Sequence, residues 1–195
     1  MRCAQIMFLA TCGLLAPTVA RTQTWQIDQM HSAAQFSVRH LGISTVRGQF
    51  EKLSGSVTYD PAAPDKTSIS ASIDANSVNT RVEMRDNDLR SPNFLDVAKF
   101  PTITFKSKRI EPSGSGKLKV IGDLTIHGVT REVTLDVDGP SPAIKDPMGN
   151  SRMGASASTK INRRDFGVNG APAMAGDEVL ITLDIEMFVP QPTGK

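Results

Sequence analysis

Cysteine is almost absent from this chain. Only Cys3 and Cys12 occur among its 195 residues, and both fall within residues 1–20. The rest of the chain therefore has no thiol for a disulfide, a nucleophile or a thiolate metal site. Apolar burial and hydrogen bonds must stabilise whatever folds here, and this length is sufficient for one domain with one sizeable core.

Clustered charge and aromatic residues are also scarce. The 22 Lys and Arg are dispersed among 20 Asp and Glu, and the chain has one Trp and one Tyr. The absence of a basic block argues against nucleic-acid binding. The lack of aromatic girdles and of apolar outward faces argues against an outer-membrane barrel. We therefore expect neither a nucleic-acid partner nor stable membrane insertion.

Sequence motifs for catalysis are missing as well. The chain contains no GxSxG, P-loop or GxGxxG motif, and its three histidines lie on separate segments without metal-ligand spacing. Asp86, Asp88 and Asp96 lack the spacing and terminal glutamate of an EF-hand, which favours a solvated charged segment over a calcium site. We expect no enzyme activity, no cofactor and no metal.

Residues 1–20 have the features of a secretory signal peptide. Arg2 precedes an apolar run at residues 6–15, and small residues follow. The run is shorter than the roughly 20 apolar residues of a spanning helix. We predict cleavage after Ala20, a periplasmic protein, and one domain over residues 21–195.

From residue 24 onward, apolar and polar residues alternate with a period of two, which is typical of strands with one buried face. The alternation is cleanest at residues 67–75, where serines oppose Ile69, Ala71, Ile73 and Ala75. About ten such segments are separated by turns rich in Pro, Gly, Asn and Asp. This pattern predicts an all-β fold, and periodicity does not choose between a barrel and a sandwich.

Small residues occupy several predicted inward positions. A filled core would have Leu, Ile or Phe at Ala71, Ala75, Ala155 and Ala157. One interpretation is an apolar cavity inside a barrel of about eight strands. The other is ordinary large-to-small packing, in which the space is filled by Phe36, Phe50, Phe105 and Met187. Alternation alone leaves both open.

The stretch RDNDLRSPNFLDVAKFP, residues 85–101, interrupts the strand pattern. Ser91 before Pro92 predicts a helix N-cap, and the preceding residues predict a brief helix with Val82 and Leu89 inward and its charges outward. The expected structure is a lid on the barrel mouth, with an apolar side formed by Leu89, Phe94 and Leu95. Pro101 marks the return to a strand.

Several motifs together resemble the YceI-like family of exported polyisoprenoid-binding proteins over nearly the whole chain after the leader. They are WQID, HSAAQFSVRHLGISTVRGQF, RDNDLRSPNFLDVAKFPTITF, GDLTIHGVTREVTL, DPMGNSRMGASASTKINRRDFGV and GDEVLITLDIEM. The resemblance implies a lipocalin-like antiparallel barrel with a short helical lid and an elongated apolar interior that holds a polyisoprenoid or similar amphiphile.

The resemblance and the alternation together suggest a binding site. The expected lining is Phe36, Val38, His40, Phe50, Ala71, Ile73, Leu89, Phe94, Phe105, Ala155, Ala157, Ile161 and Phe166. Head-group or lid contacts are expected at Arg85, Asp86, Asp88 and Arg164. The family commonly has histidine at the position of Asp88, and a carboxylate there disfavours an anionic head group. INRRDFGV sets Arg163, Arg164 and Asp165 beside Phe166 after a strand. This motif either holds an anionic head group or forms an Arg–Asp pair at a strand exit, and the pair is the favoured interpretation.

Three functions follow from these expectations. The leading one is a non-catalytic carrier or sequestering protein whose partner is a long-chain isoprenoid or fatty amphiphile, and a homodimer is compatible with it. The second is an enzyme acting on such an amphiphile by acid–base chemistry at a barrel mouth lined by His40, Arg85, Asp86 and Arg164. The third is an exported structural or stress-response module whose ligand is incidental.

Overall fold

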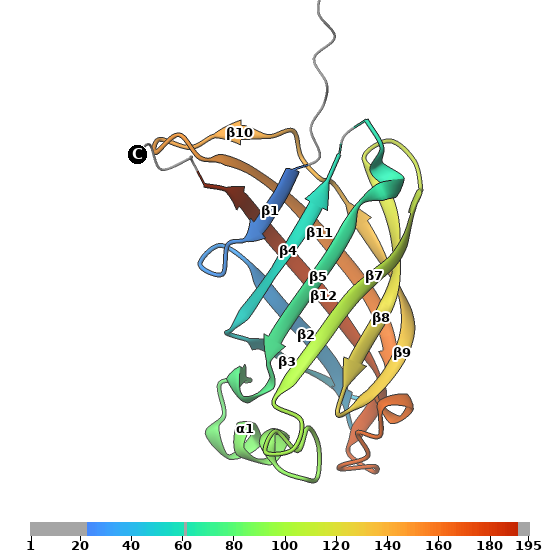
Figure 1. Ribbon diagram of the computed structural model, residues 1–195. Coiled ribbons are helices and arrows are strands. Elements are labelled where there is room, and N and C mark those ends of the chain that lie inside the picture. Colours follow the sequence, from blue (N-terminus) through green and yellow to red (C-terminus); the bar gives the residue numbers. More distant parts are fainter. Residues whose placement is uncertain (1–22, 61, 191–195) are drawn as a thin grey trace, which may run out of the picture.

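The computed structural model describes residues 23–60 and 62–190, where twelve strands form one antiparallel sheet (Figure 1). The predicted signal peptide lies outside the described residues. The strands are β1 Gln23–Ile27, β2 Ala33–His40, β3 Ser44–Phe50, β4 Leu53–Tyr59, β5 Ser68–Asp74, β6 Val78–Asn79, β7 Thr102–Pro112, β8 Lys117–Ile126, β9 Val129–Asp138, β10 Ile144–Lys145, β11 Ser151–Asn162 and β12 Ala175–Val189. The helix α1 spans Glu83–Arg90, and short 3₁₀ helices span Pro64–Lys66, Ala75–Ser77 and Arg163–Phe166.

The sheet closes on itself because β12 pairs with β11 as well as with β1 and β2. β1 and β2 pair with successive parts of β12. On their other edges, β1 pairs with β4 and β2 pairs with β3. The ring therefore has eight positions, in the order β11, β9, β8, β7, β5, β4/β3, β1/β2 and β12. The predicted all-β, lipocalin-like antiparallel barrel with a short helix is confirmed. The two-residue strands β6 and β10 were not predicted.

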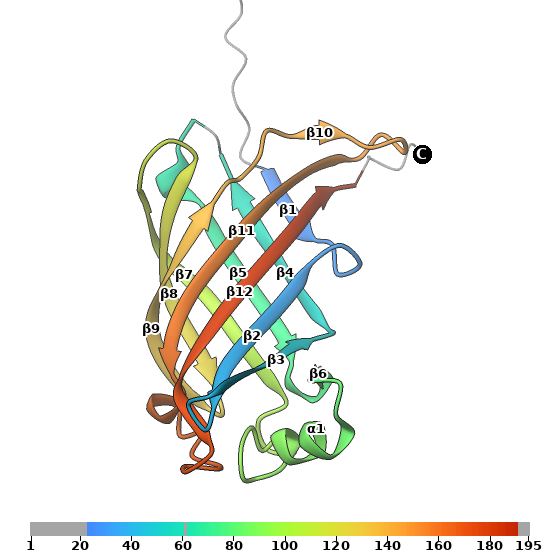
Figure 2. The ribbon, with the colours of Figure 1, turned by 180° about the vertical axis from the view of Figure 1, so that it is seen from behind.

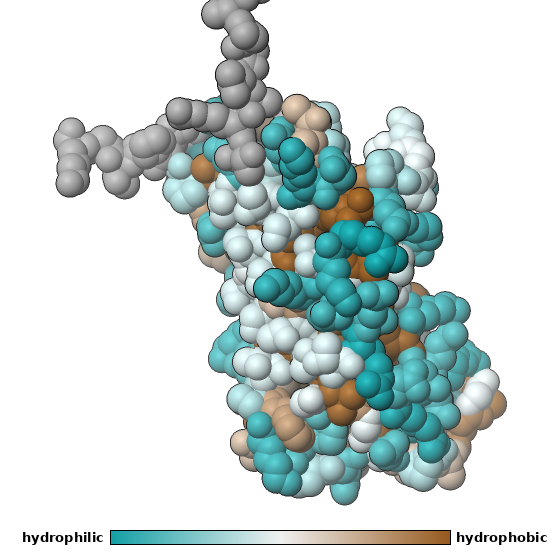
Figure 3. All heavy atoms as spheres, turned by 45° about the vertical axis from the view of Figure 1, so that its right-hand side comes forward, coloured by the Kyte–Doolittle hydropathy of each residue, from teal (hydrophilic) through white to brown (hydrophobic). Residues whose placement is uncertain are grey.

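The outer wall is polar, as the alternation predicts. On the face shown in Figure 3, hydrophilic residues predominate and hydrophobic residues form separate small areas. Inside, the buried apolar residues form three clusters, around Phe166, Val120 and Trp25. No helix in the described part of the chain is both long and apolar enough to cross a membrane.

Glycines on the inner face provide room for two phenylalanine rings. A Cβ added at Gly48 would lie 2.5 Å from Cζ of Phe36, and one at Gly122 would lie 2.6 Å from Cζ of Phe105. These two rings therefore pack over glycines of β3 and β8. Ala71, Ala155 and Ala157 line a cavity, as the first interpretation predicts. Ala75 is instead buried in a cluster with Phe50 and Phe105, as the second predicts.

The segment from Glu83 to Phe100, called the lid below, lies at one end of the barrel, and β10 lies at the other (Figure 2). Three details of its prediction are wrong. Ser91 is the C-cap of α1, and its hydroxyl accepts from the amide of Asn93 in the turn that follows, so it begins a turn and not a helix. Val82 is exposed, and Asp86 and Asp96 are buried. The helix itself, the inward Leu89 and the return to a strand after Pro101 agree with the prediction.

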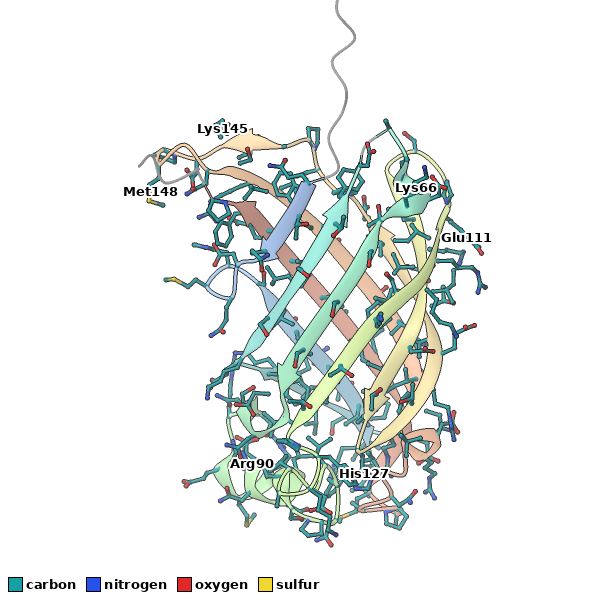
Figure 4. The ribbon with its side chains drawn as sticks, viewed as in Figure 1. Lys66, Arg90, Glu111, His127, Lys145 and Met148 are labelled. Carbon is teal, nitrogen blue, oxygen red and sulfur yellow. The ribbon has the colours of Figure 1, made fainter. Side chains whose placement is uncertain are left out.

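Hydrogen bonds and ring contacts attach the lid to the barrel. Arg90 donates to the carbonyls of Asn76 and Val78. The ring of Phe100 meets that of His127 edge-on, 4.6 Å between centroids, at the β8–β9 turn. Figure 4 places Arg90 and His127 at this end of the barrel.

At the opposite end, one arginine is shared by three carboxylates. The guanidinium of Arg152 lies 2.6 Å from Asp28, 2.7 Å from Asp146 and 2.5 Å from Glu186. It connects β11 to the β1–β2 turn, to β12 and to the turn after β10. These hydrogen bonds hold the pKa of Asp28 and of Asp146 at about 2, below the ordinary value of 3.8.

Replacing Arg152 with Gln is expected to lower the unfolding temperature at neutral pH by about 5 °C. The variant should also lose less of its unfolding temperature than wild type as the pH falls. A carboxyl whose pKa is lowered by folding stabilises the protein above its unfolded pKa, and that stability is lost as pH falls from about 4 to about 2. Thermal unfolding across this pH range measures the slope. Lys119→Gln, which breaks an exposed pair with Asp136, should leave the slope unchanged. Equal slopes in wild type and Arg152→Gln would contradict the assignment.

Candidate functional site: the barrel cavity

The barrel encloses a cavity of about 280 Å³ whose lining comes from all eight positions of the ring and from the lid. From the walls it includes Ile27, Val57, Ile69, Val120, Leu135, Leu183 and Met187. At the lid end, Leu89, Phe94, Leu95, Phe166 and Val168 contribute to the lining. The other end is packed by the cluster of Trp25, Val57, Met153 and Met187.

All of the residues expected from the sequence to bind the ligand, except His40, line this cavity. A β-bulge lies between Ala175 and Val179, where β12 pairs with β2. The extra residues of the bulge are on β12, and β2 stays in register with β3 through His40, so the alternation of β2 is unbroken. His40 is the last residue of β2 and lies beyond the lining, which corrects its expected place there.

The lining is chemically uniform. Besides apolar side chains it contains Gln35, Thr104, Thr159 and Arg163, and among the described residues it has no carboxylate, histidine or thiol. Such a surface binds hydrocarbon because apolar area is removed from water on both sides. Apart from the hydroxyls of Thr104 and Thr159, it offers no acid, base or nucleophile. An apolar ligand of modest cross-section suits it.

Among the described residues, Arg163 is the one charged residue in the lining, whereas the expected head-group contact in this motif was Arg164. Its guanidinium donates to the carbonyls of Val168, Gly170, Ala175 and Gly176 at 2.8–3.1 Å. Burial lowers the pKa of this guanidinium. Arg163 therefore fixes the loop between the last 3₁₀ helix and β12, which forms part of the mouth. The sequence signal was its position two residues after an inward strand residue, Ile161, so that alternation places both on the inner face.

The expected head-group contacts lie away from the cavity lining. Arg85 donates to the hydroxyl and carbonyl of Thr80, and Asp86 accepts from the amide and hydroxyl of the same residue. Asp88 accepts from Asn93 on the outside of the lid. The exposed Arg164 pairs with Asp177 at 2.6 Å, in agreement with an Arg–Asp pair at a strand exit, although the partner is a distant aspartate.

Replacing Thr80 with Val is expected to loosen the lid while leaving the barrel folded. The substitution keeps the shape but removes the hydroxyl that connects Arg85 to the buried Asp86, so one oxygen of a buried carboxylate loses a donor. Hydrogen exchange of residues 83–100 should become about tenfold faster or more. The half-buried Thr58→Val on β4 is a control that should change nothing in the lid. Unchanged exchange in the lid would contradict this role for Thr80.

The residues of the enzyme hypothesis do not assemble into a site. Arg85 and Asp86 meet only through Thr80, whereas His40 and Arg164 are on other strands and loops. Among the described residues, one group of three possible metal ligands occurs, Asp28, His31 and Glu186. It lies at the end opposite the lid, and the guanidinium of Arg152 already bonds to two of its carboxylates.

The family model of the YceI-like domain matches residues 25–187, which includes every strand of the barrel wall. The chain belongs to the YceI-like family. The resemblance seen in the sequence motifs is thereby confirmed, and the match lies within the predicted domain.

Relatives and solved structures agree with this assignment. A UPF0312 protein of Vibrio cholerae is 36% identical over 166 residues, which cover 82% of this chain and 87% of that protein. The crystal structure of Burkholderia cenocepacia BcnA superposes with a TM-score of 0.73 at 25% identity, covering 82% of this chain and 98% of that one. A Saccharophagus degradans domain described as polyisoprenoid-binding shares the fold, with a TM-score of 0.64 at 16% identity, covering 87% and 100% of the two chains.

Proposed function

We propose that this YceI-like protein binds a polyisoprenoid or a similar long-chain amphiphile in its barrel cavity and carries or sequesters it in the periplasm. The observation that carries the proposal is the cavity of about 280 Å³ with an almost wholly apolar lining inside a polar barrel. The description of the Saccharophagus degradans domain as polyisoprenoid-binding supports the ligand class. The predicted signal peptide supports the compartment.

The energetics suit a ligand that is mostly hydrocarbon. At roughly 25 cal/mol per Å², burial of several hundred Å² of an alkyl or prenyl chain contributes on the order of 10 kcal/mol before ordering costs. Branched methyl groups match a lining of Ile, Val, Leu and Phe, in which each added contact is favourable. Because the donors of Arg163 are engaged by four carbonyls, the chain of the ligand, and not its head group, is what this cavity recognises.

The test is to identify what the protein holds after export. Protein purified from the periplasm of an exporting host is extracted with organic solvent, and native mass spectrometry compares its mass before and after extraction. The proposal expects a stoichiometric long-chain amphiphile and an N-terminus at residue 21. A protein that emerges without ligand and does not take up added polyisoprenol would overturn the binding function. An intact leader on the isolated protein would overturn the compartment alone.

A further inference from the structure

The β2–β3 turn, at the lid end of the barrel, has an unusual composition. It carries Leu41 and Ile43 on either side of Gly42, and their exposed fractions are 54% and 80%. Leu41 has φ of 51°, a left-handed conformation that favours Gly, Asn and Asp. A tight turn gains no stability from two exposed aliphatic side chains, one of them strained. Exposed aliphatic side chains on a strained turn therefore indicate a surface that binds another molecule.

Other exposed apolar side chains lie at the same end. The amide of Leu41 donates to the carbonyl of Met174, whose side chain is 51% exposed on the loop before β12. On the lid, Met84 is 82% exposed, and Val82, directly before the lid, is exposed as well. The mouth of the barrel is thus bordered by apolar side chains on the β2–β3 turn, on the loop beside it and on the lid.

The β2–β3 hairpin itself carries charge of one sign. Residues 29–50 contain no Asp or Glu, and residues 166–176 contain no charged residue. The guanidinium of Arg39 donates to the carbonyl of Gly42 at 2.6 Å and to the hydroxyl of Thr45, which holds it against the turn. Within the described residues, neither Arg39 nor Arg47 belongs to an ion pair. At the opposite end, by contrast, one Arg152 faces three carboxylates.

We propose that the lid end of the barrel docks on an anionic lipid bilayer through the β2–β3 turn. Leu41 and Ile43 enter the boundary between head groups and acyl chains, and Arg39 and Arg47 bind lipid phosphates. A second copy of the chain fits this turn less well, because a two-fold contact would bring two acid-free, arginine-bearing turns together. The inference goes beyond the proposed function, and it places the mouth of the cavity against a source of apolar ligand.

Vesicle cosedimentation of the purified, exported protein tests the docking. Neutral phosphatidylcholine vesicles are compared with vesicles that also contain phosphatidylglycerol, at low and high salt. The paired change Leu41→Asn and Ile43→Thr suits the turn, so it should preserve folding while weakening binding to anionic vesicles tenfold or more. Arg47→Gln should weaken binding about fivefold and reduce its salt dependence. The control is Met30→Asn with Met148→Thr, which removes two highly exposed methionines and should bind as wild type. Met148 lies at the end opposite the lid (Figure 4), and the amide of Met30 donates to Asp28 of the Arg152 cluster at that end.

Three outcomes would overturn the docking: no preference for anionic vesicles, wild-type binding by the turn variant, or an equal loss in the control. A concentration-dependent dimer that the turn variant abolishes, without vesicle binding, would assign the surface to a second copy instead. The lipid content of each purified variant is measured in parallel. Empty cavities in a protein that binds vesicles would count against the proposed function alone, and loaded cavities in one that does not would count against the docking alone.

Discussion

Protein with phenylalanine at both Ala71 and Ala157 is expected to purify without lipid. The two alanines line the cavity from β5 and β11, which are four positions apart in the ring of eight and therefore form opposite walls. Two phenyl rings entering a space of about 280 Å³ leave no continuous path for a hydrocarbon chain. We expect at least a tenfold loss of extractable lipid, with a cost to folding of roughly 1–3 kcal/mol per overpacked site.

The matched control moves the same rings to the outside of the same strands. Ser70 and Ser156 precede Ala71 and Ala157 and are exposed, so Ser70→Phe with Ser156→Phe adds equal aromatic surface without entering the cavity. Lipid content by solvent extraction and mass spectrometry should be that of wild type in the control. Retention of full lipid by the inward variant, with its unfolding temperature near wild type, would show that the ligand lies elsewhere.

The barrel wall was predictable because the alternation of side chains is strict wherever strands are regular. Ile69, Ala71 and Ile73 line the cavity as the pattern of residues 67–75 predicts. Prediction failed at the end of a strand: His40 is the last residue of β2 and lies beyond the lining, although its strand keeps its register with β3. Alternation gives the face of a residue, but it does not say how far along the barrel the cavity extends.

The lid shows a second limit of prediction from sequence, which is that one short motif can form more than one local structure. Ser91 before Pro92 is as suitable for the turn after a helix as for the start of one, because its hydroxyl can accept from an amide two residues on in either case. Asp86 looked like a solvated charge, yet Thr80, six residues earlier, supplies two donors that allow its burial. Such pairing depends on how the chain turns between the two residues.

Arg163→Met is expected to destabilise the protein by about 3 kcal/mol or more, whereas Arg164→Met should cost less than about 1 kcal/mol. The sequence gives neighbouring arginines in one motif, and only the 3₁₀ turn that follows β11 separates their roles. Arg163 turns inward and satisfies four carbonyls, while Arg164 stays exposed with Asp177. Methionine fills the volume of Arg163 but leaves those carbonyls without donors. Urea unfolding of both variants measures the difference, and equal losses would contradict it.

The same substitution should affect the lid. Gly170, one of the four residues whose carbonyls accept from Arg163, packs on Phe94 of the lid, so the Arg163 variant should also exchange its lid amides faster. A stability loss without faster lid exchange would confine the role of Arg163 to the loop it bonds.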